Sequence, residues 1–141
     1  MLQHLSIFLE NKPGKLNRIV ELLGGAGVNL RAFSIAGAGA FGILKILVDD
    51  ADKAAQILFD AGLAVAKRRI LVARIPDRPG ALSVLMNDLS SAGVNVSDSY
   101  GFLLPDSTAA IALECDDFDK AERTIRENGL SVVDDLRQLE A

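Results

Sequence analysis

The chain has little of what most catalytic and metal sites require. Its 141 residues include one cysteine, one histidine and no tryptophan. A single cysteine excludes an intrachain disulfide and a zinc cluster. A single histidine removes most histidine-based metal sites and nucleophile–base pairs. These counts remove most metal sites and most cysteine- or histidine-based mechanisms, and we expect no catalytic residue, no metal and no cofactor.

Long apolar runs and an excess of basic residues are also missing. No apolar run approaches the roughly 20 residues that cross a membrane, and the N-terminus shows no signal-peptide pattern. The net charge is −4 and the isoelectric point about 4.9, which does not suit a protein that covers nucleic-acid phosphates. These features predict a cytoplasmic protein with neither a membrane nor a nucleic acid as partner.

The composition that remains is that of a folded protein with an aliphatic core. Half of the residues are hydrophobic and 24% are charged, whereas aromatic residues make up only 5%. Such a balance is typical of globular domains, and the length suits one medium domain or two small ones.

The second half of the sequence repeats the first. At an offset of 66 residues, Pro13-Gly14 matches Pro79-Gly80 and the tetrapeptide of residues 26–29 matches that of residues 92–95. After one inserted residue the offset is 67, and Asp52-Lys53-Ala54 then matches Asp119-Lys120-Ala121. These matches predict two homologous units, residues 1–68 and 69–141.

Each unit has the hydrophobic pattern of a β-α-β-β-α-β order. In the first unit, Leu5, Ile7 and Leu9 alternate as in a strand, and the apolar residues of 16–23 recur at helical spacing. This order predicts an α+β, ferredoxin-like fold, an antiparallel sheet with two helices on one face. Because no linker separates the two units, we expect them side by side in one sheet of about eight strands. Edge strands and an uncovered sheet face favour self-association, which predicts a homodimer.

Two matched loops are the candidate binding site. Each joins the first strand of a unit to the N-terminus of its first helix, where free N–H groups favour a carboxylate. Glycine lets a ligand approach the backbone, and Asn or Asp oxygens at the loop mouth suit an ammonium group. We expect Asn29 and Asn95 to join them, with the second strand beside the first. The predicted ligand-binding residues are Asn11, Lys12, Pro13, Gly14, Lys15, Leu16 and Asn29 in the first unit, and Asp77, Arg78, Pro79, Gly80, Ala81, Leu82 and Asn95 in the second.

The sequence favours the second loop as the stronger site. Its backbone N–H groups at Gly80, Ala81 and Leu82 would receive a carboxylate, and Arg78 would shield the mouth, with a weaker site in the first unit. If Gly80 does not adopt a positive φ, Gly80→Ala should abolish binding and leave the fold intact.

The repeated pattern resembles the ACT domain. It reads [Asn/Asp]-[Lys/Arg]-Pro-Gly-x-Leu, followed by Ala-Gly-Val-Asn, in both units. The resemblance implies pairing of ACT units and an effector, usually an amino acid, between them, held by the first loop and by second-strand residues. It also implies a non-catalytic regulatory role. Because the sequence has no catalytic or DNA-binding domain, it resembles a free-standing ACT pair that regulates a separate, unidentified enzyme.

Three alternatives use the same element order. An acylphosphatase-like enzyme would need an arginine-bearing phosphate loop; Arg78 and Asn95 fit it superficially, but the glycine-rich loop ending in Phe-Arg is absent. An RNA-recognition domain would need aromatic residues on its central strands, and 43–48 and 109–115 have none. A protein-interaction module without a ligand is the third.

Overall fold

The computed structural model describes residues 1–140, which form two compact units. One unit is Gln3–Arg68; the other begins at Arg69 and includes Met1–Leu2, where the Ile70 amide donates to the Leu2 carbonyl at 3.0 Å. The first unit contains β1 (Gln3–Glu10), α1 (Lys15–Gly25), β2 (Leu30–Ala38), β3 (Phe41–Val48), α2 (Ala51–Asp60) and β4 (Ala64–Arg69).

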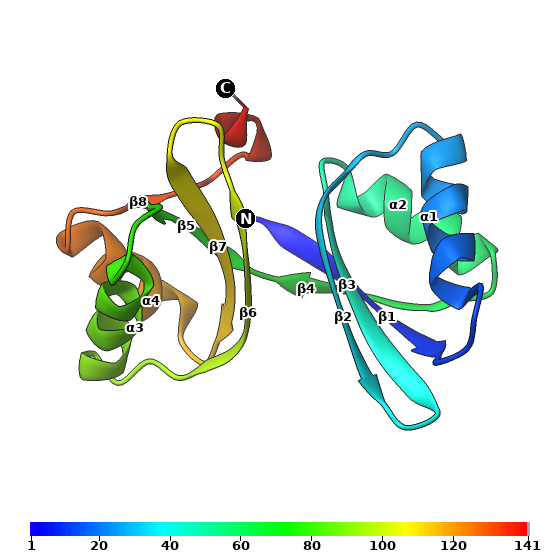
Figure 1. The fold of residues 1–141 in the computed structure, drawn as a ribbon, viewed down its shortest axis with the longest axis horizontal. Helices are drawn as coiled ribbons and strands as arrows, with labels where there is room; N and C mark the ends of the chain where they lie inside the picture. The colour runs from blue at the N-terminus through cyan, green and yellow to red at the C-terminus, as the bar shows by residue number, and fades with distance from the viewer. Residues whose placement is uncertain (141) are drawn as a thin grey trace. The chain divides into compact units, whose positions relative to one another are not determined.

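The second unit repeats this order. Its elements are β5 (Leu71–Pro76), α3 (Ala81–Ser91), β6 (Val96–Leu103), β7 (Thr108–Cys115), α4 (Phe118–Glu127), the short β8 (Ser131–Val132) and a closing 3₁₀ turn, η1 (Leu136–Leu139). Within each unit the two helices lie on one face of the sheet (Figure 1). The predicted ferredoxin-like α+β fold is confirmed. Among residues 1–140, no helix is long and apolar enough to cross a membrane.

The strands form two sheets rather than one. Their orders are β2-β3-β1-β4 and β6-β7-β5-β8. The expectation of one eight-stranded sheet was therefore wrong, because the strands of each unit pair only among themselves. In both sheets the second strand of the unit is an edge strand that pairs with the third strand, and the first strand occupies an interior position.

An aliphatic core fills the space between sheet and helices in each unit. In the first, Leu5, Ile7, Leu44 and Ile46 project from the sheet and are fully buried, because paired residues such as Leu5 and Ile46 share one face. Helices α1 and α2 cover this face with Ile19, Leu23, Ala54 and Leu58. Burying such a side chain contributes about 1.5–3 kcal/mol to folding.

The helix starts follow two different local rules. Asp50 and Asp117 cap α2 and α4, because each carboxylate accepts a hydrogen bond from a backbone amide three residues on, at 3.0 Å. Gly14 and Gly80 precede α1 and α3 with φ of 86° and 87° and without a side-chain cap. The condition attached to Gly80→Ala is therefore not met: a side chain at this φ is strained, and the substitution should disturb the fold itself.

The face of the first sheet away from its helices is partly apolar and exposed. Phe8 pairs in register with Ile43, and the Phe8 ring stacks on Phe41 with 5.0 Å between centroids. In the second unit, Arg74 replaces Phe8 at the offset of 66, and its guanidinium donates to the Gln138 carbonyl in η1 at 2.9 Å. The closing turn thus lies over the corresponding part of the second sheet.

Candidate ligand-binding site

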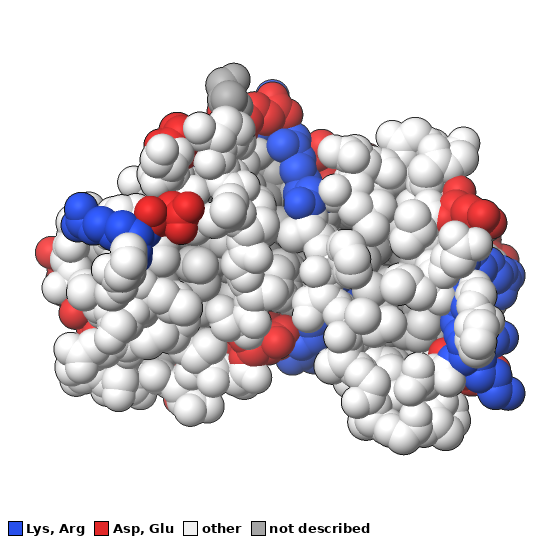
Figure 2. Space-filling model, viewed as in Figure 1, with Lys and Arg blue, Asp and Glu red and all other residues white. Residues whose placement is uncertain are grey.

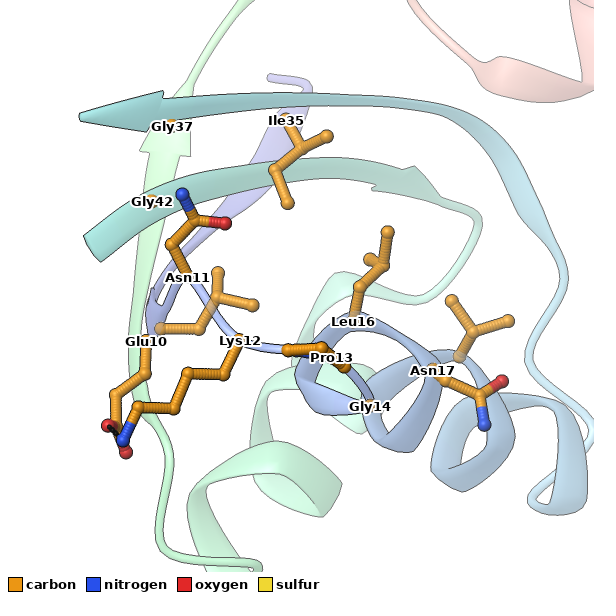
Figure 3. Close-up of a pocket in the computed structure, with 12 residues that line it drawn as sticks. Glu10, Asn11, Lys12, Pro13, Gly14, Leu16, Asn17, Ile35, Gly37 and Gly42 are labelled. Atoms are coloured by element: carbon orange, nitrogen blue, oxygen red, sulfur yellow. Dashed lines mark ion pairs between the residues drawn. The ribbon is translucent and has the colours of Figure 1, made fainter. Parts of the chain in front are cut away.

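A cavity of about 730 Å³ opens at the β1–α1 loop of the first unit (Figure 3). Its volume is within the usual range for small-ligand sites. The loop supplies residues 10–14, α1 supplies its first two turns, and the β2–β3 hairpin closes the far side. The lining residues are Leu9, Glu10, Asn11, Lys12, Pro13, Gly14, Leu16, Asn17, Val20, Ile35, Gly37 and Gly42.

Asn11 is fixed in one orientation by the hairpin. Its backbone amide donates to the Ala40 carbonyl at 2.8 Å, and its side-chain Nδ2 donates to the Gly39 carbonyl at 3.1 Å. The side-chain nitrogen is used in this way, whereas the side-chain oxygen accepts no hydrogen bond from residues 1–140. Figure 3 shows this oxygen turned to the side of the cavity that holds Ile35 and Leu16. The geometry offers a cation one fixed acceptor.

The start of α1 supplies free donors on the other side of the cavity. Lys15 donates its amide to the Lys12 carbonyl at 3.3 Å, and the next bonded amide is that of Arg18, which donates to Gly14. The amides of Leu16 and Asn17 have no acceptor within residues 1–140. Together with the helix dipole, they make a position for a carboxylate. Gly14 leaves this position open, since nothing lies within 4 Å of the point where its Cβ would be.

Two lysines share one carboxylate at the cavity edge, which leaves this group with a net charge of +1. Lys12 and Lys15 lie 3.0 and 3.5 Å from the carboxylate of Glu10. The hydrogen bond from Lys12 and the charges of both lysines lower the pKa of Glu10 below its usual value. Glu10 is therefore ionised at neutral pH.

Asn29 does not reach this cavity, contrary to the sequence-based expectation. Strands β1 and β2 both run antiparallel to β3, so the start of β2 and the end of β1 lie at opposite ends of the sheet. The eight steps from Asn29 to Gly37 span about 26 Å of extended chain. Asn29 lines a different cavity, of about 390 Å³, which shares Leu16 and Val20 with the first.

Asn95 is separated from its loop in the same way. Its amide donates to the Asp116 carboxylate at 2.9 Å, at the end of β7, whereas β5 ends beside the start of β7. The expectation failed because the second strand pairs with the third and not with the first. An alternating hydrophobic pattern identifies a strand but does not identify its neighbours.

The β5–α3 loop repeats the backbone of the first loop. Asp77 donates its amide to the Ser107 carbonyl of the β6–β7 hairpin at 3.0 Å, in the way that Asn11 donates to Ala40. The Ala81 amide donates to the Arg78 carbonyl at 3.2 Å, so Ala81 is already bonded and does not fit the donor role expected for it. Within the described part of the chain, the amides of Leu82 and Ser83 in the first turn of α3 have no acceptor.

Sequence reasoning missed the hairpin side of the cavity. Ile35, Gly37 and Gly42 line it, and a Cβ added to Gly37 would lie 3.3 Å from Nδ2 of Asn11. A signal was present in the repeat, because the second unit has Leu103 and Ala109 where the first has Gly37 and Gly42. The end of the hairpin around its tip, residues 32–44, is uncharged, and this end of the first unit is white in Figure 2.

Comparison with known proteins agrees with this architecture. The ACT domain pair family matches residues 1–140. The structure is similar to that of protein BT0572 from Bacteroides thetaiotaomicron, with 34% identity, a TM-score of 0.88, and coverage of 94% of this chain and 91% of that one. It is also similar to the ligand-free regulatory subunit of aspartate kinase from Thermus thermophilus, with 13% identity, a TM-score of 0.70, and coverage of 91% and 93%.

These matches establish the family of the chain. It belongs to the ACT domain pair family, since the match extends over both units and a relative is more than 30% identical over nearly the whole length. No protein with curated annotation matches the sequence. The similarity to the aspartate kinase subunit, at 13% identity, shows a shared fold.

Proposed function

We propose that this protein is a non-catalytic regulatory protein that binds a free amino acid in the cavity of its first unit. The observation that carries the proposal is the arrangement of complementary groups around that cavity. The amides of Leu16 and Asn17 would receive the α-carboxylate, and the Asn11 oxygen would receive the α-ammonium group. Gly14 and Pro13 shape the loop so that the ligand can approach the backbone. Lys12 and Lys15, paired with Glu10, border the mouth.

The second loop is proposed as a weaker site, which reverses the order expected from sequence. Asp77 and Arg78 would take the positions of Asn11 and Lys12, and Pro79, Gly80 and Leu82 those of the first loop. The reason for the reversal is Leu103, which stands where the first unit has Gly37. A Cβ at Gly37 already comes within 3.3 Å of the Asn11 side chain, so a larger residue leaves less room.

Asn29 and Asn95 would contribute to ligand sites in a second copy of the chain. Each precedes an edge strand, and antiparallel pairing of two β2 strands would bring the start of one strand beside the end of the other. The partner's Asn29 would then lie next to the cavity that Asn11 lines. Exposed Phe33, on the edge strand β2, favours this pairing, because 60% of its surface is accessible. We therefore propose a homodimer with ligand sites between ACT units.

The regulatory role is supported by family membership and by shared fold. The ACT domain pair match covers residues 1–140, and the aspartate kinase regulatory subunits share this fold. We propose a separate enzyme of amino-acid metabolism in the cytoplasm as the regulated partner.

A thermal-shift screen of the full chain against the twenty amino acids tests the proposal. A ligand at about 100 times its dissociation constant adds about 2.7 kcal/mol to the free energy of unfolding. Calorimetry of the best ligand with Asn11→Ala should show a loss of about 1.5–3 kcal/mol, or 10- to 150-fold in Kd, because a hydrogen bond to a charged group disappears.

Gln56→Ala is the matched control. The Gln56 side-chain amide donates to the Asp60 carboxylate at 2.8 Å on α2, and Gln56 is not among the residues that line the cavity. Binding should therefore be unchanged. A ligand whose affinity is the same in wild type and Asn11→Ala would place the site elsewhere. If no amino acid stabilises the protein, the alternative of an interaction module without a ligand is favoured.

A further inference from the structure

The wall of the first cavity beyond Asn11 is aliphatic. Leu9, Leu16, Val20 and Ile35 contribute it, and Figure 3 shows the side chains of Leu16 and Ile35 pointing toward one another across the space. Val20 and Ile35 remain 42% and 45% exposed. A ligand that fills this part of the cavity would remove apolar surface from water, which is favourable in proportion to the area covered.

The charged and polar lining residues face other partners. Glu10 and Lys12 meet at 3.0 Å, on the side of the cavity away from Leu16 and Ile35 in Figure 3. Asn17 is bonded to Glu21. Asn11 and the helix start are the positions already assigned to the two charged groups of the amino acid. No charged group within the described lining faces the aliphatic wall, so nothing there would compensate the desolvation of a polar side chain.

The second unit keeps three of these four positions apolar, as Ile75, Leu82 and Met86, but lacks the side chain that corresponds to Ile35. Gly101 replaces Ile35 at the offset of 66 and pairs with Ile111, as Ile35 pairs with Leu44. The space above Gly101 is filled from the neighbouring strand, because a Cβ there would lie 2.9 Å from Cδ1 of Ile111. The two units therefore differ in the part of the loop site that would contact a side chain.

We infer that the first-unit cavity selects an amino acid with a branched aliphatic side chain, that is, leucine, isoleucine or valine. The inference rests on the proposed amino-acid site and specifies its ligand class. With the two charged ends held by Asn11 and the start of α1, the side chain extends toward Leu16, Val20 and Ile35. Each buried methylene tightens binding about fourfold. Leucine, three carbons longer than alanine, should bind about 50-fold more tightly than alanine.

Calorimetry on the full chain tests this inference with L-leucine, L-isoleucine, L-valine, L-alanine, L-serine, L-aspartate and L-lysine. We expect measurable binding for the three branched amino acids and binding of alanine about 50-fold weaker than that of leucine. The polar and charged amino acids should bind no more tightly than alanine. In Ile35→Ser, the affinity for leucine should fall about tenfold while the affinity for alanine stays nearly constant, because only leucine reaches the wall.

Ile43→Ser is the matched control. Ile43 is 44% exposed and lies on β3 of the same sheet, and its register with Phe8 places it on the face away from the helices. Leucine affinity should be unchanged in this variant. Sedimentation of Ile35→Ser should show the same assembly state as wild type, so that a change in pairing does not explain the loss.

The outcomes separate the two proposals. If serine or aspartate binds as tightly as leucine and is lost in Asn11→Ala, the ligand class is wrong and the amino-acid site stands. Leucine binding that is lost in Asn11→Ala and unchanged in Ile35→Ser would equally overturn the aliphatic wall. If no amino acid binds at all, both proposals fail. Should Ile35→Ser not fold, the ratio of leucine to alanine affinity in wild type still decides the ligand class.

Discussion

The proposed pairing through β2 makes Phe33→Asp a sharp perturbation of assembly. Phe33 lies on the edge strand and is 60% exposed. Fully burying such a side chain is worth about 1.5–3 kcal/mol, so covering the exposed part contributes about 1–2 kcal/mol in each copy. In a two-fold symmetric interface both copies bury Phe33, so this contribution is doubled. Phe33→Asp should therefore weaken the dimer by at least about 2–4 kcal/mol, or about 30- to 700-fold in Kd.

Sedimentation equilibrium over a range of protein concentrations measures this change. The matched control is Phe59→Asp, which replaces another exposed phenylalanine of the same unit, 69% accessible on α2. Phe59 lies beside Val65 and Lys67 of β4, which is the opposite edge strand of the sheet. The control should leave the dimer intact. The reasoning would be refuted if the wild-type protein were a monomer at a concentration of roughly tens of micromolar. It would also be refuted if Phe59→Asp weakened the dimer and Phe33→Asp did not.

Three further predictions concern the fold. Gly80→Ala should lower the free energy of unfolding by about 1–2 kcal/mol, because it places a side chain at positive φ. Gly24→Ala should raise that free energy by about 0.4–1 kcal/mol, because Gly24 lies inside α1 with open space at its Cβ. Equal effects of the two substitutions in urea unfolding would contradict this reasoning. Leu58→Ala should lower the free energy of unfolding by about 2–5 kcal/mol, because Leu58 is fully buried in the core of the first unit. A loss below about 1 kcal/mol in urea unfolding would be too small for a buried leucine. Burial raises the pKa of the Cys115 thiol, so iodoacetamide should alkylate the native protein at pH 8 more slowly than the urea-unfolded chain; equal rates would show that the thiol is not shielded.

The sequence predicted the element order because its signals were local and repeated. The spacing of Leu16, Ile19 and Leu23 identified α1, and the matching Pro-Gly pairs placed both helix starts. The same pairs identified the loop that borders the cavity. Each of these features depends on residues within one or two turns of each other, and the second unit provided an independent copy.

The neighbours of the strands could not be obtained in the same way. Alternation in β2 shows which residues share a face, but the choice of β3 rather than β1 as its partner depends on the whole sheet. For that reason Asn29 was placed at the wrong end, and Ile35, which lines the cavity, was overlooked. The positive φ of Gly80 was recognised as a condition, but its value depends on how the loop enters the helix.

The central claim is that a free amino acid binds at the β1–α1 loop of the first unit. The most direct measurement is a ¹H–¹⁵N NMR titration of the full chain with L-leucine, with backbone amides assigned. The account predicts that the largest shifts occur in the amides of residues 11, 12, 14–17 and 35–42, and that Leu16 and Asn17 move downfield as their N–H groups bond to the carboxylate. Leucine that binds the chain and leaves these amides unchanged, or that shifts only residues 77–83, would contradict it.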